Sequence, residues 1–177
     1  MHLPMKTPEL DKPVARKAAH YIDGANYVPS YLSHLNNRLS SGASQLYLKH
    51  FGVGINEWRI LSVLSNWPRS TAGTIGETVG MHKTVVSRSL REMEEKQLVT
   101  IATGDGQRLM DLTPAGQRLH DRIVLVALER ERLLTQDFSD DERRTLIALL
   151  ARMLANVEGV NAWDPVAEPA KRRRSAA

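Results

Sequence analysis

Apolar side chains recur at steps of three and four residues through most of the chain, and this spacing predicts helices. Between residues 26 and 50 the repeat is carried by Leu32, Leu35, Leu39 and Leu46. The same periodicity predicts further helices over residues 56–66, 71–79, 82–96, 113–135 and 139–158. The chain is therefore expected to be mainly helical.

The ends of these helices are expected at residues with capping or helix-breaking roles. Asn56 is expected to cap the second helix, and Gly80 to form the tight turn between the third and the fourth. Thr113, which is followed by proline, is expected to cap the fifth helix. Ser139 opens a capping box before the last helix, which Gly159 is expected to end.

The hydrophobic period changes from 3.6 to 2 between residues 98 and 112. Residues 98–101 form a β-prone run, residues 103–106 have the composition of a turn, and residues 108–112 can return as a second strand. The pattern therefore predicts an all-α fold with one small β-hairpin.

The order of these elements indicates a helix-turn-helix. Two short helices joined by a turn at Gly80 are followed by the hairpin, and the second helix, over 82–96, can enter a major groove of DNA. Its inward stripe is expected to be Val86, Leu90 and Met93. The hairpin would then act as a wing on the neighbouring DNA backbone or minor groove.

Charge is segregated along this helix. Residues 81–91 contain three cations and no acid, whereas residues 92–95 contain three glutamates. The front half therefore suits phosphates, and its other exposed side chains suit base edges. The candidate DNA-binding residues of the helix are Lys83, Thr84, Val85, Ser87, Arg88 and Arg91. An amphipathic helix with a solvated charged face is the alternative, but the preceding helix and the following hairpin favour DNA binding.

Composition narrows the function further. Of the 24 Lys and Arg residues, four form the run 171–174, and the remaining 20 balance the 20 Asp and Glu residues. The chain has no cysteine, its six histidines lack zinc-site spacing, and no apolar run approaches the roughly 20 residues of a membrane span. We expect no metal site, no cofactor, no enzymatic activity and no membrane association.

Four short strings resemble the MarR family of winged helix-turn-helix transcription regulators over residues 30–158. The strings are Asn56-Glu-Trp-Arg-Ile-Leu61, Gly80-Met-His-Lys-Thr-Val-Val-Ser-Arg88, Glu94-Glu-Lys-Gln-Leu-Val99 and Leu112-Thr-Pro-Ala-Gly116. The resemblance implies a homodimer with intertwined outer helices, a recognition helix over 82–96 and a wing over 98–112.

The wing departs from the family pattern near its tip. Family wings usually carry Asp-x-Arg there, with the arginine in the minor groove, whereas this chain has Gly104-Asp105-Gly106-Gln107-Arg108 and is one residue short before Leu112. Either Arg108 or Gln107 occupies the position of the family's arginine, and Arg108 is favoured.

Family members often bind small anionic or aromatic effectors between the dimerisation helices and the winged domain. The corresponding residues here are two aromatic side chains, two arginines and one histidine, namely Tyr31, His34, Arg38, Trp58 and Arg59. A cation in an aromatic cleft suits a carboxylate or phenolate. Alternatively, the arginines pair with Glu57, Asp23 or acids of a partner subunit, and Trp58 is a core residue.

These observations predict five segments. They are an N-terminal arm over 1–25, a dimerisation helix within 26–54, the winged DNA-binding domain over 55–112, C-terminal dimerisation helices within 113–160 and a disordered basic tail over 161–177. The expected function is that of a cytoplasmic bacterial repressor, located on the nucleoid when bound, that leaves a pseudo-palindromic operator when an effector binds. The alternative is a winged-fold protein-interaction module that does not read DNA.

Overall fold

The computed structural model describes residues 22–104 and 106–165 of the chain. These residues form two compact units, of which the first ends at His120 and the second begins at Asp121. Most of the expected N-terminal arm and of the basic tail, including residues 171–174, lies outside the described residues.

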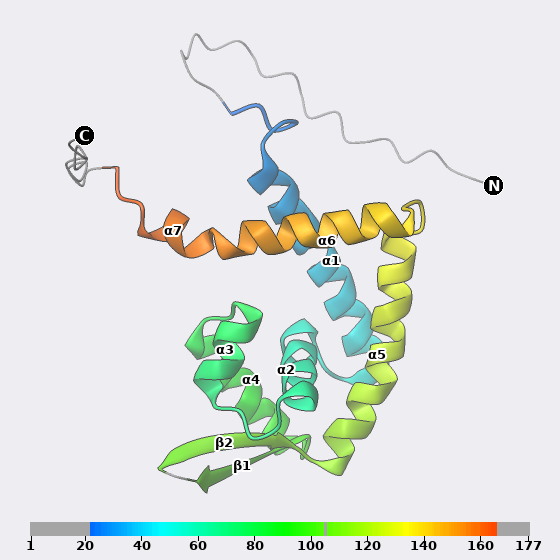
Figure 1. Ribbon diagram of the computed structural model, residues 1–177. Helices are drawn as coiled ribbons and strands as arrows, with labels where there is room; N and C mark the ends of the chain where they lie inside the picture. The colour runs from blue at the N-terminus through cyan, green and yellow to red at the C-terminus, as the bar shows by residue number, and fades with distance from the viewer. Residues whose placement is uncertain (1–21, 105, 166–177) are drawn as a thin grey trace. The chain divides into compact units, whose positions relative to one another are not determined.

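The first unit is helical apart from one hairpin, as the sequence predicted. Its elements are α1 (Val28–Phe51), α2 (Ile55–Asn66), α3 (Ala72–Val79), α4 (Lys83–Glu95), β1 (Val99–Gly104), β2 (Gln107–Leu112) and the start of α5 (Pro114–Leu134). Figure 1 shows α2, α3 and α4 gathered over the two strands, with contacts among the three helices and from α2 and α4 to the hairpin. This arrangement is a winged helix-turn-helix.

The core of this unit is built from the inward faces of the three short helices. Ile60 and Leu61 of α2 and Ile75 of α3 are fully buried. The expected inward stripe of α4 is confirmed, because Val86, Leu90 and Met93 are at most 2% exposed. Burying a side chain of this size contributes roughly 1.5–3 kcal/mol, so the stripe fixes which face of α4 remains in solvent.

The expected cap of α2 is wrong by two residues. Gly54, rather than Asn56, is the N-cap of α2. The reason is that Glu57 occupies the third position of the helix, where its carboxylate Oε2 accepts a hydrogen bond from the Gly54 N–H at 2.8 Å. The turn before α4 follows the expectation, because Gly80 has a left-handed φ of 65°.

The strands are longer and the turn shorter than the sequence predicted. The register pairs Val99 with Leu112 and continues to Gly104 opposite Gln107, which leaves a two-residue loop. Residues 103 and 104 therefore belong to β1 and not to the turn. A two-residue loop needs positive φ, and Gly106 supplies it with a φ of 73°.

The base of the hairpin is fastened to the start of α5. The hydroxyl of Thr113 accepts the Gly116 N–H at 3.0 Å and donates to the Gln97 carbonyl at 2.7 Å, which confirms the expected cap. The Thr113 N–H donates to the Leu98 carbonyl at 3.1 Å. A Cβ atom on Gly116 would stand 2.0 Å from that carbonyl oxygen, so only glycine fits there.

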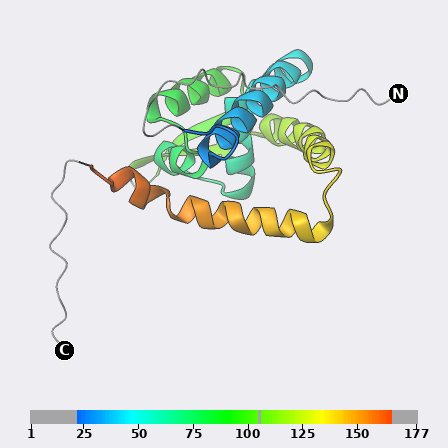
Figure 2. The same cartoon turned by 90° about the horizontal axis from the view of Figure 1, so that it is seen from above.

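The second unit contains the rest of α5, then α6 (Asp140–Ala155) and α7 (Val157–Ala162), which Figure 2 shows as successive helices. The expected capping box is confirmed, since Ser139 and Glu142 exchange hydrogen bonds. Those bonds, first from the backbone and then from the hydroxyl of Ser139, lower the pKa of Glu142 below its ordinary value.

The expected helix end at Gly159 is wrong. The helix breaks at Asn156, and Gly159 lies inside α7, which continues to Ala162. Glycine ends a helix when it adopts positive φ, and Gly159 does not. The first two residues of the expected disordered tail are therefore helical.

The apolar stripe of α6 and α7 is exposed in the single chain. Its members are between 38% and 48% exposed, and they are Leu146, Leu149, Leu150, Met153 and Val157. In the first unit, α1 likewise exposes Tyr31, Leu35 and Leu39. No helix among the described residues is both long and apolar enough to cross a membrane.

Candidate nucleic-acid interface

The predicted DNA-binding residues of α4 all lie on its exposed side. Burial of the apolar stripe turns Lys83, Thr84, Ser87, Arg88 and Arg91 toward solvent. Val85 is 39% exposed, and its apolar side chain suits contact with a thymine methyl group. The structure thus presents a polar, cationic ridge with one apolar side chain at the front of α4.

A groove of about 480 Å³ separates this ridge from the hairpin. It is lined by the start of α3, one side of α4 and both strands, with Thr71, Ala72, Gly73, Lys83, Ser87, Leu90, Arg91, Glu94, Ile101, Gln107, Arg108 and Met110. Lys83 and Arg91 from α4 therefore face the same space as Arg108 from β2. Three cations against one acid favour a polyanion in this groove.

A second groove, of about 470 Å³, lies on the other side of the ridge. It is lined by the start of α2 and by α4, with Asn56, Glu57, Thr84, Val85, Arg88, Ser89 and Glu92. The predicted residues of α4 are thus divided between two concave surfaces. A convex ridge between two grooves has the shape needed to enter the major groove of a duplex.

Arg88 is held by an acid on its own helix. Its Nε donates to Oε1 of Glu92 at 3.0 Å, and the two side chains are 82% and 43% exposed. Exposed pairs of this kind contribute only about 0.2–1 kcal/mol, so DNA can replace the glutamate at little cost. The two Nη groups of Arg88 have no partner among the described residues, and an arginine fork of this kind is able to pair with guanine.

A buried polar link that the sequence did not predict lies beneath the ridge. Ser89 is 4% exposed, and its hydroxyl donates to Oε1 of Glu57 at 2.7 Å. The other oxygen of the same carboxylate caps α2 at Gly54. One side chain thus ties the start of α2 to α4. Helical spacing places Ser89 on the buried side of α4, three residues after Val86, but its partner Glu57 lies on another helix.

Both candidates for the wing tip are exposed and line the first groove. Gln107 pairs with Gly104 and adjoins the loop, whereas Arg108 pairs with Thr103 one position further from it. The choice between them stays a prediction.

We expect Arg108→Ala to weaken binding to duplexes with A·T-rich flanks more than to G·C-rich ones, because a narrow minor groove concentrates negative potential. Titrations of both duplexes by fluorescence anisotropy measure this, and a larger effect of Gln107→Ala would assign the tip to Gln107.

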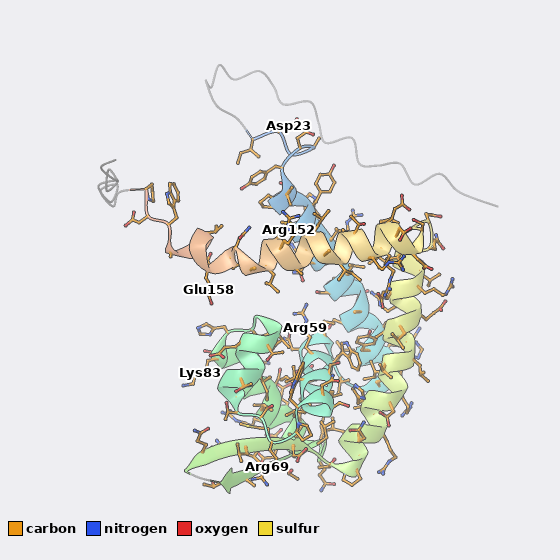
Figure 3. The ribbon with its side chains drawn as sticks, in the orientation of Figure 1. Asp23, Arg59, Arg69, Lys83, Arg152 and Glu158 are labelled. Carbon is orange, nitrogen blue, oxygen red and sulfur yellow. The ribbon has the colours of Figure 1, made fainter. Side chains whose placement is uncertain are left out.

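Three of the five predicted effector residues are exposed, whereas Trp58 and Arg59 of α2 are half-buried. Tyr31, His34 and Arg38 are exposed on α1, and Arg59 projects from α2 toward it (Figure 3). Arg59 Nη2 donates to the Ser40 hydroxyl at 3.1 Å and to Asn36 Oδ1 at 3.5 Å. Neither Glu57 nor Asp23 pairs with Arg59, so no described carboxylate neutralises its charge.

Trp58 packs among aromatic residues of the first unit. Its ring stacks on His120 at 5.4 Å between centroids, and its edge meets Tyr47 at 6.0 Å. His120 is thus a packing partner of Trp58. Neither of the two grooves beside α4 includes Trp58 or the other predicted effector residues. The described residues contain no cluster of three or more His, Asp or Glu side chains suited to a metal ion.

Comparison with known proteins matches this architecture to transcription regulators. A family model for the MarR family matches residues 51–108. The chain is 30% identical to a MarR/EmrR family transcriptional regulator from Acinetobacter sp. ADP1, whose crystal structure superposes with a TM-score of 0.74 over 78% of this chain and 99% of that one.

Two further proteins resemble this chain, the first in sequence and the second in fold. The HTH-type transcriptional regulator YwoH of Bacillus subtilis is 25% identical over 134 residues, or 73% of this chain and 98% of YwoH. The DNA complex of MepR from S. aureus shares the fold, with a TM-score of 0.66 and 21% identity over 74% of this chain and 96% of MepR.

The fold and its exposed cationic helix define a winged helix-turn-helix protein of the class that regulates transcription. The chain belongs to the MarR family of transcriptional regulators. Its relatives are regulators and not enzymes.

Proposed function

We propose that this protein is a sequence-specific DNA-binding regulator that places α4 in the major groove. The observation that carries the proposal is the ridge of α4, which has an exposed cationic front and an anion-attracting groove on its hairpin side. Base edges would be read by Thr84, Val85, Ser87 and Arg88, and phosphates bound by Lys83 and Arg91. MepR, which has the same fold, has been solved with DNA.

We further propose that the protein binds DNA as a homodimer. The exposed apolar stripe of α6 and α7 and the exposed leucines of α1 are surfaces that a second copy would cover under two-fold symmetry. On this proposal residues 26–54 and 113–160 provide dimerisation helices, and residues 55–112 form the DNA-binding domain. A two-fold dimer presents two copies of α4, so its binding site is pseudo-palindromic.

Selection from a pool of random-sequence duplexes tests the proposed function directly. We expect the recovered duplexes to share two inverted half-sites about one helical turn, roughly 34 Å, apart. The upstream region of the protein's own gene is the first natural duplex to assay by gel shift. Recovery of no common sequence, with no shift of that region, would favour a winged-fold module that binds proteins instead.

The regulation we propose is repression relieved by a small aromatic anion. Arg59 carries an uncompensated charge beside α1, Arg38 is exposed on that helix, and Tyr31 and Trp58 offer aromatic surface. A guanidinium would pair with a carboxylate of the ligand while an aromatic side chain packs against its ring. Both copies of α4 must fit successive major grooves, so a ligand that favours a differently spaced dimer weakens binding.

We expect one member of a panel of benzoates, hydroxycinnamates and their coenzyme A esters to bind the free protein more tightly than the DNA-bound protein. A coupling of about 1–3 kcal/mol corresponds to a factor of roughly 5–150, and it must be the same in both directions. Calorimetric titration with and without a selected duplex measures it. Equal affinity in both titrations would refute release, and binding unchanged by Arg38→Ala and Arg59→Ala would refute this location of the site.

A further inference from the structure

The turn between α2 and α3 is attached to the hairpin as a short third strand. Ser70 forms an isolated β-bridge with Met110, and the Met110 N–H donates to the Ser70 carbonyl at 2.9 Å. Because Met110 also pairs with Ile101 of β1, β2 lies between β1 and this turn. The Ser70 hydroxyl donates to the Trp67 carbonyl at 2.7 Å, which stabilises the turn itself. Arg69, which directly precedes Ser70, is therefore held beside the wing, as Figure 3 shows.

The guanidinium of Arg69 lies against the end of β1. A Cβ atom built on Gly104 would stand 3.5 Å from Arg69 Nη2 and 3.1 Å from Leu109 Cδ1. The missing side chain at Gly104 leaves the space into which Arg69 reaches. Arg69 is exposed and forms no ion pair with any residue that the structure describes. A solvent-accessible positive charge thus stands next to the wing loop.

Arg69 and Arg108 lie on opposite faces of the hairpin. Successive residues of a strand point to opposite faces, and directly paired residues share one. Arg108 pairs with Thr103, so its face is opposite to the one on which a Cβ atom of Gly104 would lie. Arg69 contacts that Cβ position, whereas Arg108 lines the groove beside α4. The wing consequently carries one cation on each face.

We propose that Arg69 is a DNA-binding residue of the wing and contacts the phosphate strand on the side away from Arg108. This inference rests on the proposed DNA-binding function. The minor groove is only about 6 Å wide and has a phosphate strand along each edge, so a hairpin that enters it meets phosphates on both faces. Arg108 serves one strand and Arg69, from a different part of the sequence, serves the other.

The backbone of Arg69 permits a test that separates binding from stability. Its φ of 58° lies in the left-handed region, which glycine adopts without strain and arginine does not. Arg69→Gly therefore removes the guanidinium and the strain together. DNA affinity is expected to fall while the stability of the fold stays the same or rises, whereas replacing an arginine with a purely structural role would lower both.

The experiment measures binding of the full chain to two labelled 30-base-pair duplexes, one A·T-rich and one of mixed sequence, by fluorescence anisotropy over a salt series. We expect Arg69→Gly to lower the affinity for both duplexes to the same extent, by about 5- to 10-fold at the lowest salt. The slope of log K against log salt is negative, and it should become shallower by about 0.9 for each Arg69 in the complex. The midpoint of thermal unfolding should stay the same or rise by about 2–4 °C.

Two matched variants complete the design. Arg69→Lys keeps the charge and should keep the salt slope. Lys49→Ala removes one positive charge from α1, a helix that lines neither groove, and this variant should keep the affinity of the wild type. If the wild type binds neither duplex, the proposed function and this inference both fail. If the wild type binds and Arg69→Gly binds equally well, only this inference is wrong. A lower unfolding temperature together with weaker binding would assign Arg69 a structural role and would overturn it too.

Discussion

Leu150→Asp is expected to convert the protein to monomers and to lower its affinity for a two-half-site duplex by about 10²- to 10⁴-fold. Leu150 is 39% exposed in the middle of the apolar stripe of α6, where a second copy would bury it. A buried, unpaired carboxylate is costly enough to prevent association. Once the copies separate, each half-site binds independently, and the gain from linking two binding events is lost. Light scattering gives the mass, and gel shift gives the affinity.

Ala148→Asp is the matched control for this variant. It introduces the same residue into the same helix, and its loss of helix propensity is slightly larger than that of Leu150→Asp because alanine is the best helix former. At 100° per residue, however, position 148 lies on the side of α6 opposite the stripe. We expect it to remain dimeric and to bind DNA like the wild type. A monomeric wild type at micromolar concentration, or a dimeric Leu150→Asp variant with normal DNA binding, would contradict the proposed dimer.

Arg88→Ala is expected to reduce the discrimination between a selected duplex and a random one by roughly 5- to 150-fold for each half-site. A bidentate arginine–guanine contact is worth about 1–3 kcal/mol of discrimination, and the two Nη groups of Arg88 are available for it. Affinity for random DNA should fall much less, because Arg88 would serve a base edge and not a phosphate. Competition titrations with the two duplexes yield the ratio of affinities.

Glu92→Gln separates the role of the charge on Arg88 from that of its ion pair. This variant removes the acid that holds Nε of Arg88 but keeps the guanidinium. We expect discrimination to be retained and affinity for both duplexes to rise slightly, because a negative charge leaves the interface. Equal losses on both duplexes from Arg88→Ala would instead identify a phosphate contact, and the base-reading assignment would be wrong.

The sequence predicted those elements whose signals are local. The spacing of Val86, Leu90 and Met93 located the buried face of α4, because helical periodicity depends only on neighbours along the chain. Thr113 and Ser139 located two helix starts for the same reason, since a cap needs a partner only three residues away. The hairpin followed from its alternation, although the register, which fixes the loop at two residues, came only from the structure.

What the sequence could not predict depends on residues that are distant along the chain. Ser89 is buried because Glu57, from another helix, accepts its hydroxyl, and no local pattern announces such a partner. Arg69 belongs to the α2–α3 turn by sequence but lies beside the wing, because Ser70 pairs with Met110. A search for wing cations confined to residues 98–112 necessarily overlooks it.

The close approach of Gly116 to the Leu98 carbonyl bears on how genetic data on this protein should be interpreted. Any side chain at position 116 displaces the carbonyl that closes the base of the hairpin through Thr113. The resulting variant would be defective in DNA binding although position 116 is itself buried within the fold. A screen for regulatory loss would therefore recover substitutions of Gly116 alongside those of Arg88. Only the Gly116 variants should regain function at a lower growth temperature or through second-site changes that stabilise the hairpin.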